Sequence, residues 1–278
     1  MLLARLRAAA LVLAPLLLAG CLDYTETLTL EKDGGGTLAF DFTVDMSYMA
    51  DVSRAIGDEP TPEDTRGPTR EEVAAGLEAD GITVEELIVD EQTKDKKTRV
   101  RARIRFKDLA ALGRLEGFGN DRKLEFFDEG GGKVRVVYSF DTSDLVPIEE
   151  VAPDEAGGAE EDPVEKKILE ISKRARENLR FRAKVVMPGA VEKSNGKPDP
   201  QDPNAARWRV DRESEPEKHE RLGRGKIVMM LMVERASLPF VQDKDIKQPP
   251  ARREGDDKPA GPKPEEPRRP GPPSGLGD

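Results

Sequence analysis

The sequence predicts an α+β protein in which a mainly antiparallel sheet is built of β-hairpins with intervening helices and is followed by a disordered, proline-rich tail. Three observations support this fold class. Apolar and polar residues alternate on both sides of glycine-rich turns, stretches between them carry apolar residues at helical spacing, and the chain's end is rich in proline and charge. The 278 residues are 36% hydrophobic and 36% charged, so part of the chain is expected to stay outside the core.

The composition excludes several kinds of site. A single cysteine rules out an intramolecular disulfide and any multi-cysteine zinc or iron–sulfur site, and a single histidine rules out a histidine-cluster metal site. The net charge of −10 argues against a general nucleic-acid binder. We therefore expect no metal, no cofactor and no nucleic-acid partner.

The first 20 residues are typical of a secretory signal peptide. Arg5 and Arg7 precede an apolar run over 8–18, which is too short to span about 30 Å of hydrocarbon. The run ends in Leu18-Ala19-Gly20-Cys21, which resembles the lipobox of bacterial lipoproteins. The resemblance implies cleavage between Gly20 and Cys21 and acylation of the Cys21 thiol with fatty chains such as palmitate. The alternative is an ordinary signal peptide followed by a free cysteine.

The acylated cysteine would be the membrane attachment. Each acyl CH₂ adds about 0.8 kcal/mol of membrane affinity, so two or three chains give a stable anchor. Loss of the leader removes two arginines and changes the net charge from −10 to −12. Leu22 rather than Asp follows the cysteine, which by resemblance to enterobacterial sorting rules favours the outer over the inner membrane. The expected location is the bacterial cell envelope, outside the cytoplasm.

The first expected element is a hairpin directly after this cysteine. Tyr24, Leu28 and Leu30 alternate with threonines, and a second alternating run over 38–44 follows the turn at 33–36. Only two residues separate Cys21 from the first strand. The folded body is therefore expected close to the lipid headgroups.

The next elements follow from the same patterns. A helix is expected over 46–56 and a loop over 57–68, and Glu71 and Glu72 favour the first turn of a helix from 68 or 69 to 79. Polar turns predict two more hairpins, separated by a short helix over 108–115. Their strands are 82–91 with 98–107, and 123–128 with 133–141.

The second half begins with an acidic stretch, 149–163, which is expected to be an exposed loop. An amphipathic helix is expected over 164–179. Further strands are expected over 181–187, 206–210 and 227–233. Residues 249–278 hold nine of the 22 prolines. The expected segments are the leader 1–20, one α+β domain 21–242 and the disordered tail 243–278.

Several of these features occur together in one family. They are the lipobox, the strand ending at Asp33-Gly34, and the series Phe181, Pro188-Gly189, Asn195-Gly196 and Trp208-Arg209-Val210. In these features the chain resembles the LppM-like lipoprotein domain of bacteria, over about residues 21–240. The resemblance implies a cell-envelope domain without a defined activity. Members commonly end in a hydrophobic helix, whereas this chain ends in a proline-rich tail.

The most distinctive pattern is the alternation of cations with apolar residues on three expected strands. Their cations are Arg99, Arg101, Arg103, Arg105 and Lys107 on the first, Arg180, Arg182 and Lys184 on the second, and Arg207 and Arg209 on the third. Such a face would bind anionic lipid headgroups, phosphate or an acidic envelope polymer. The alternative is a solvated face, neutralised across the hairpin by Glu85, Glu86, Asp90 and Glu91.

Seven consecutive apolar residues, three of them methionines, form the expected strand 227–233. Such a run predicts a central strand that is covered on both faces. The alternative is a lipid-accepting groove, since methionine packs adaptably and seven extended residues span about 23 Å.

The sequence gives little support for catalysis, and no catalytic residue is predicted. His219 lies in a charged stretch that is expected to face solvent, and no serine has the glycine neighbours of a nucleophile elbow. Gly34-Gly35-Gly36 leads into a strand rather than a helix, so it is not a phosphate loop. The acidic pairs Glu149/Glu150 and Glu160/Glu161 leave a glycosidase pair open.

The sequence thus predicts a non-enzymatic, membrane-anchored lipoprotein with a binding or envelope-maintenance role. Its ligand would contact either the basic face or an apolar groove. One alternative is a scaffold or assembly factor whose tail captures a protein partner, because 30 residues of polyproline II reach about 90 Å. The other is a carboxylate-dependent envelope hydrolase.

Overall fold

A computed structural model describes residues 21–61, 66–92, 97–115, 122–141, 163–219 and 226–249. The leader, most of the expected acidic loop and residues 250–278 lie outside this part. By its contacts the chain divides into two units, 1–248 and 249–278, and every helix and strand described below belongs to the first.

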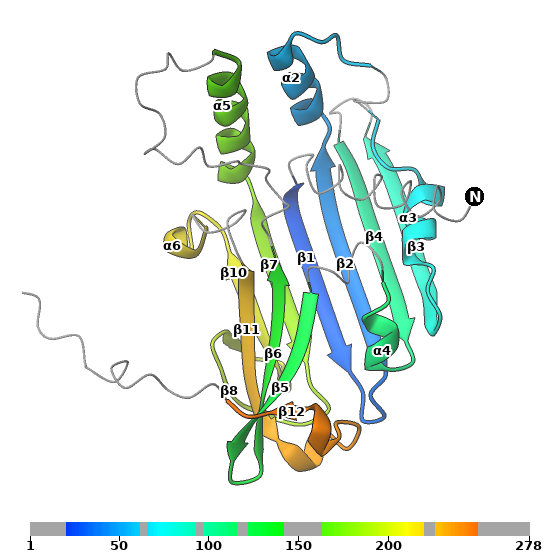
Figure 1. Cartoon of the computed structure of the whole chain (residues 1–278), viewed down its shortest axis with the longest axis vertical. Helices are drawn as coiled ribbons and strands as arrows, with labels where there is room; N and C mark the ends of the chain where they lie inside the picture. Colours follow the sequence, from blue (N-terminus) through cyan, green and yellow to red (C-terminus); the bar gives the residue numbers. More distant parts are fainter. Residues whose placement is uncertain are drawn as a thin grey trace, which may run out of the picture. The chain divides into compact units, whose positions relative to one another are not determined.

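Two β-sheets form this unit (Figure 1). Sheet A contains, in spatial order, β3 (Ile82–Gln92), β4 (Lys97–Phe106), β2 (Gly36–Asp45), β1 (Cys21–Leu30), β7 (Arg180–Val186), β10 (Asp202–Val210) and β9 (Lys197–Asp199). Sheet B contains β12 (Ile246–Lys247), β5 (Arg122–Gly130), β6 (Lys133–Asp141), β11 (Lys226–Glu234) and β8 (Val191–Ser194).

Helices connect these strands, at the expected places except for a short one at 216–219 that was not predicted. They are α2 (Ser47–Ile56), α3 (Arg70–Leu77), α4 (Leu109–Leu112), α5 (Pro163–Glu177) and α6 (Pro216–His219). Thr69 begins α3 with a capping box, in which its hydroxyl accepts from the Glu72 amide and the Glu72 carboxylate accepts from the Thr69 amide. No helix of the described part is both long and apolar enough to cross a membrane.

The structure confirms a sheet-dominated fold with helices between strands, and it corrects the expectation of one mainly antiparallel sheet. There are two sheets, and each is mixed, because β1 pairs in parallel with β7 and β12 in parallel with β5. Two short strands, β8 and β9, and the two-residue β12 were not predicted, since segments of this length show little periodicity. η3 (Asp243–Asp245) and β12 also continue the structure a few residues past the expected boundary at 242.

The core lies between the inner faces of the two sheets. Alternation along each strand brings Leu28, Phe40 and Ile104 from sheet A against a cluster that includes Val136 and Leu231 from sheet B, all at most 2% exposed. A separate small cluster joins the two longest helices. It consists of Tyr48 and Ala55 of α2 and Ile171 of α5, with Val52, Ile168 and Ala175 packed around them.

The turn Asn195-Gly196 carries the chain from one sheet to the other. β8 on one side of the turn belongs to sheet B, and β9 on the other side belongs to sheet A. The side-chain nitrogen of Asn195 donates to the Val228 carbonyl at 2.8 Å. Its side-chain oxygen accepts from the backbone amide of Met230 and from the indole nitrogen of Trp208. The side chain thus makes hydrogen bonds with β11 that a neighbouring strand would otherwise make, and it connects sheet A to sheet B.

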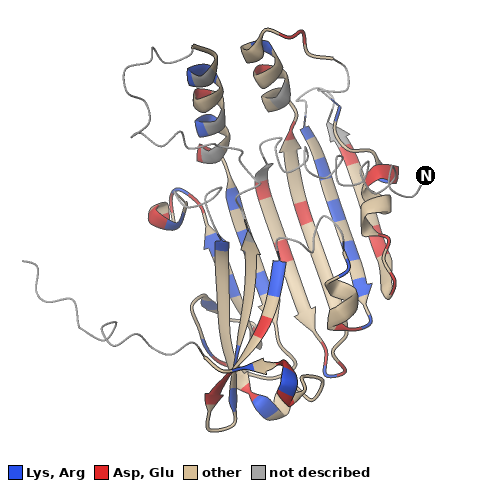
Figure 2. Cartoon of the chain, viewed as in Figure 1, with Lys and Arg blue, Asp and Glu red and all other residues tan. Residues whose placement is uncertain are grey.

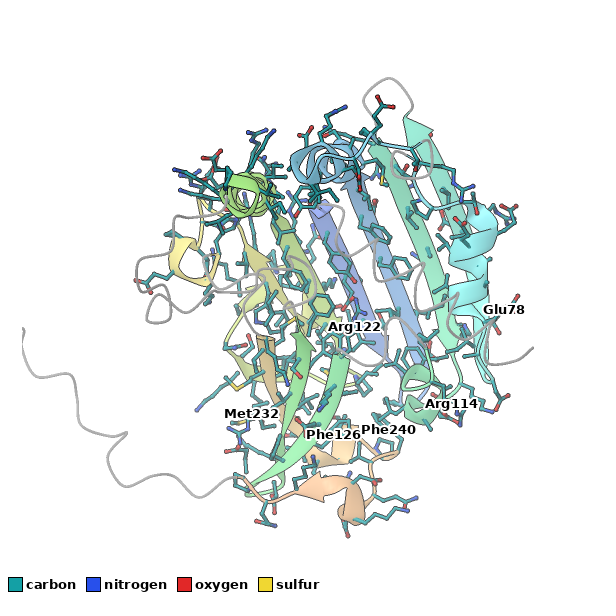
Figure 3. All side chains as sticks on the ribbon, turned by 45° about the horizontal axis from the view of Figure 1, so that its top comes forward. Glu78, Arg114, Arg122, Phe126, Met232 and Phe240 are labelled. Atoms are coloured by element: carbon teal, nitrogen blue, oxygen red, sulfur yellow. The ribbon has the colours of Figure 1, made fainter. Side chains whose placement is uncertain are left out.

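The expectation that strand 227–233 is covered on both faces is wrong. Met229, Leu231 and Val233 are buried, but Val228 is 40% exposed and Met230 and Met232 are half-buried. The second set, which includes Met232 (labelled in Figure 3), lies on the outer face of sheet B. Val137 and Arg135 of β6 stand opposite the two methionines. Neighbouring side chains from β6 therefore give this face partial cover.

Candidate functional site

The cations of the three basic strands all belong to one surface, the outer face of sheet A. In one row across the sheet, Arg101 lies opposite Asp41, Asp41 opposite Thr25, Thr25 opposite Arg182, and Arg182 opposite Arg209. Figure 2 shows the cations recurring along β4. We call this surface the basic face and define it as Arg99, Arg101, Arg103, Arg105, Lys107, Arg180, Arg182, Lys184, Arg207 and Arg209.

The strand order divides the basic face into two parts. β4 lies on one side and the neighbouring strands β7 and β10 on the other, with β2 and β1 between them. Three strand spacings separate β4 from β7, or about 14 Å. The two middle strands present mostly short, half-buried side chains, which are Thr25, Thr27, Thr29, Thr37, Ala39 and Thr43. Hydroxyl groups are thus flanked on both sides by cations.

Exposed ion pairs neutralise much of the β4 part. Asp41 accepts from Nε and Nη2 of Arg99 at 2.8 and 2.6 Å and from Nε of Arg101 at 3.3 Å. The hydrogen bond from Arg99 lowers the pKa of the Asp41 carboxyl. Arg105 donates to Glu85 at 2.8 Å and to Glu31 at 3.0 Å. Neutralisation therefore comes from both neighbouring strands, and not only from across the β3–β4 hairpin as expected.

A buried carboxylate organises the β7–β10 part. Asp199 accepts from Nε and Nη2 of Arg207 at 2.7 and 2.8 Å and pairs with Nζ of Lys184 at 2.8 Å, and its side chain has no exposed surface. Hydrogen bonds from Lys184 and from the Gln201 amide lower the pKa of Asp199 to about 2.

This lowered pKa predicts a defined acid sensitivity. Because the folded-state pKa lies below the usual value of about 3.9, the stability from the charged form is complete above about pH 4 and is lost as pH falls towards 2. Urea unfolding at steps from pH 5 to 2 should therefore show a shallower loss for Asp199→Asn than for the wild type. Asp80→Asn, at an exposed carboxylate, should keep the wild-type slope, and equal slopes for all three proteins would contradict this assignment.

Two cations of the basic face are free to meet a ligand. Within the described ranges, Arg103 and Arg180 have no carboxylate oxygen within 4 Å, and both are exposed. Arg103 lies on β4 and Arg180 begins β7, so each part of the basic face contains one unpaired guanidinium.

The expected lipid site lies at one end of sheet A. Cys21 begins β1 and stands opposite Val44, so no tether separates it from the folded body. Gly20, the other expected residue at the cleavage site, lies outside the described residues. β1 has β2 on one side and β7 on the other, so the residue expected to be acylated starts a strand near the middle of the sheet.

A buried polar cluster between the sheets was not predicted. Glu26, 2% exposed, accepts from the hydroxyls of Tyr24 and Tyr138 at 2.5 Å each and from Nη2 of Arg122 at 2.8 Å. Arg122 begins β5 (Figure 3), and its guanidinium lies 4.5 Å from the centre of the Phe140 ring. Burial raises the pKa of both tyrosines well above 10. The only signal in the sequence was a carboxylate at a core-facing position of β1.

The single histidine also differs from its expectation. His219 is 5% exposed rather than solvent-facing, and its Nε2 lies 3.1 Å from the carbonyl oxygen of Leu179. In the described part of the chain, no group of three or more histidine, cysteine, aspartate or glutamate side chains is placed to hold a metal ion. The pairs Glu149/Glu150 and Glu160/Glu161 lie outside it.

Comparison with known proteins gives a distant structural likeness. No protein-family model matches the sequence, and no curated protein matches it. The chain is similar to the folded domain of LppM from Mycobacterium tuberculosis, solved by NMR, with 15% identity and a TM-score of 0.36. The match covers 76% of this chain and 88% of that one. A likeness at this level carries no functional conclusion.

Proposed function

We propose that this chain is a membrane-anchored bacterial lipoprotein that binds anionic groups, without catalysis, on the basic face of sheet A. The anchor is the acylated Cys21, and the ligands are lipid headgroups or an anionic polymer of the cell envelope. One observation carries the proposal: three cationic strands, with Lys107 directly after β4, place ten lysine and arginine side chains on one side of sheet A.

The ion pairs on this face do not prevent anion binding. Exposed pairs between arginine and carboxylate contribute little to stability, so a phosphate or another anion can exchange for the carboxylate. Arg103 and Arg180 need no such exchange. A guanidinium binds a phosphate through two parallel hydrogen bonds, and the threonine hydroxyls between the two basic parts can both donate and accept.

The position of Cys21 in sheet A favours binding of the basic face to the membrane surface. β1 runs from Cys21 directly into the middle of the sheet that carries the cations. Acylation would therefore hold this sheet within a few residues of the headgroups, where each lysine or arginine gains about 1 kcal/mol from an anionic membrane surface. Most of the tail on which a scaffold role depends, residues 250–278, lies outside the described residues.

Reversal of the two unpaired charges tests this proposal. The leaderless chain with Cys21→Ser is mixed with vesicles of phosphatidylglycerol and phosphatidylcholine, and separately with soluble polyphosphate. Combining Arg103→Glu with Arg180→Glu is expected to weaken binding by at least about tenfold. Arg103 stands opposite Glu86 and Arg180 opposite Asp23, so the reversed charges face carboxylates and urea unfolding must accompany the binding assay. Arg103→Gln with Arg180→Gln, which adds no negative charge, should weaken binding in the same direction.

The control keeps the net charge and changes its position. Lys123→Glu with Lys193→Glu makes the same charge change at exposed positions on the outer face of sheet B and should bind like the parent. Binding to vesicles alone would identify headgroups as the ligand, and binding to polyphosphate alone would identify a polymer. Equal losses in both double variants, or no binding by the parent to either probe, would overturn the proposal.

A further inference from the structure

The two most exposed large hydrophobic residues of the described chain lie on one pair of helices. Leu169 of α5 is 55% exposed and Ile56 of α2 is 51% exposed, more than any other large apolar residue described. Single exposed apolar residues are common on protein surfaces. Here, however, both belong to helices that pack against each other through Tyr48, Ala55 and Ile171.

The helix pair is joined to sheet A at the end where β1 begins. α2 starts directly after β2, whose residue Val44 stands opposite Cys21. α5 leads into β7, whose first residue Arg180 stands opposite Asp23. Figure 1 shows α2 and α5 side by side, both extending beyond this end of the sheet. The exposed apolar residues thus lie past the residue expected to carry the lipid.

The helices are long enough to cross the headgroup region of the membrane. At 1.5 Å per residue, Ile56 lies about 14 Å along α2 from Ser47, and Leu169 lies about 12 Å along α5 from Glu177. The headgroup region of one leaflet is roughly 5–8 Å thick. A pair that extends from the acylated end towards the bilayer can therefore place both side chains at the boundary between headgroups and acyl chains.

The residues around Leu169 fit this environment. Lys166, three positions earlier, and Lys173, four positions later, share its side of α5 and are exposed. Lysine can lay its apolar stem along a hydrophobic surface while its ammonium group stays with the phosphates. Lysines beside an apolar side chain likewise occur on helices at membrane surfaces.

We propose that the ends of α2 and α5 enter the surface of the bilayer that holds Cys21, with Ile56 and Leu169 at the upper ends of the acyl chains. The partner is the membrane itself. The inference rests on the acylation of Cys21 in the proposed function and adds a second contact, which fixes how the domain stands on the membrane. It does not depend on the basic face.

Fluorescent labels at single positions test the contact in the acylated full chain. Acylation blocks the Cys21 thiol, so a new cysteine is the single free thiol in each variant. The variants Ile56→Cys and Leu169→Cys, and the control Val228→Cys on sheet B, are labelled with an environment-sensitive dye and reconstituted into phosphatidylcholine and phosphatidylglycerol vesicles. Emission at 56 and 169 should rise several-fold and be quenched by nitroxide lipids, whereas emission at 228 should not change.

The possible failures can be told apart. If vesicle flotation shows that the chain is anchored, but labels at 56 and 169 behave like the label at 228, the helix contact is overturned and the anchor stands. If the chain does not float with vesicles, the acylation of Cys21 fails and the helix proposal fails with it. A label at Ile88, opposite Arg101 on the outer face of sheet A, reports separately on whether the basic face touches lipid.

Discussion

Replacing Arg122 with methionine is expected to lower the free energy of unfolding by about 3–5 kcal/mol. The substitution leaves the Glu26 carboxylate, 2% exposed, without the cation that neutralises it. Methionine keeps most of the volume, so the loss should come from the uncompensated charge rather than from a cavity. Urea unfolding at neutral pH, followed by circular dichroism, measures the change.

Two further variants separate charge from packing. Arg182→Met removes an arginine that also pairs with a carboxylate of β1, at 3.1 Å from Asp23, but both partners are about 40% exposed. It should cost no more than about 1 kcal/mol. Combining Arg122→Met with Glu26→Gln removes both buried charges, keeps an oxygen that can accept from the hydroxyl of Tyr24 or Tyr138, and should recover much of the lost stability. An equal loss in the free energy of unfolding for Arg122→Met and Arg182→Met would show that the buried ion pair contributes no more to stability than the exposed one.

Cys21→Ser is expected to release the whole protein from the membrane. Two fatty chains contribute on the order of 0.8 kcal/mol for each buried CH₂, far more than headgroup contacts and two apolar side chains can replace. With the leader replaced by one that is cleaved without acylation, palmitate labelling in growing bacteria should be absent, and the Cys21→Ser chain should move from the membrane pellet to the supernatant.

The neighbouring change Leu22→Ala keeps every residue of the lipobox and should retain both the palmitate label and the membrane location. Absence of label from the wild-type protein, or an intact leader on it, would remove the basis for the lipoprotein assignment. The folded domain and its basic face would then need another explanation.

Local structure was largely predictable from the sequence because its causes are local. The turn at Gly34, where φ is +89°, the cap at Thr69 and the alternation along β4 each follow from a few adjacent residues. The division into two sheets was not predictable. The pairing of β1 with β7 joins segments far apart in the chain, and no local pattern specifies which strands become neighbours.

The same limit applies to the basic face. Alternation correctly placed Arg101 and Ile104 on opposite sides of β4, because side-chain direction has a period of two. It did not show that Asp41 of β2 would hold Arg99 and Arg101, since that contact depends on strand order. For β11, the uniformly hydrophobic sequence predicts two covered faces. Strand 226–234 instead shows that an outer face can keep methionines when neighbouring side chains give partial cover.

The order of the strands along the chain affects how the protein can fold during export. The chain builds part of sheet A, then part of sheet B, and afterwards returns to each in turn. Asp23 and Arg182, which pair on adjacent strands, are 159 positions apart. Contacts between such distant residues form slowly. If the chain is exported from its N-terminus as proposed, β1 stays open along the edge that β7 covers until β7, about two thirds of the way along the chain, has crossed as well.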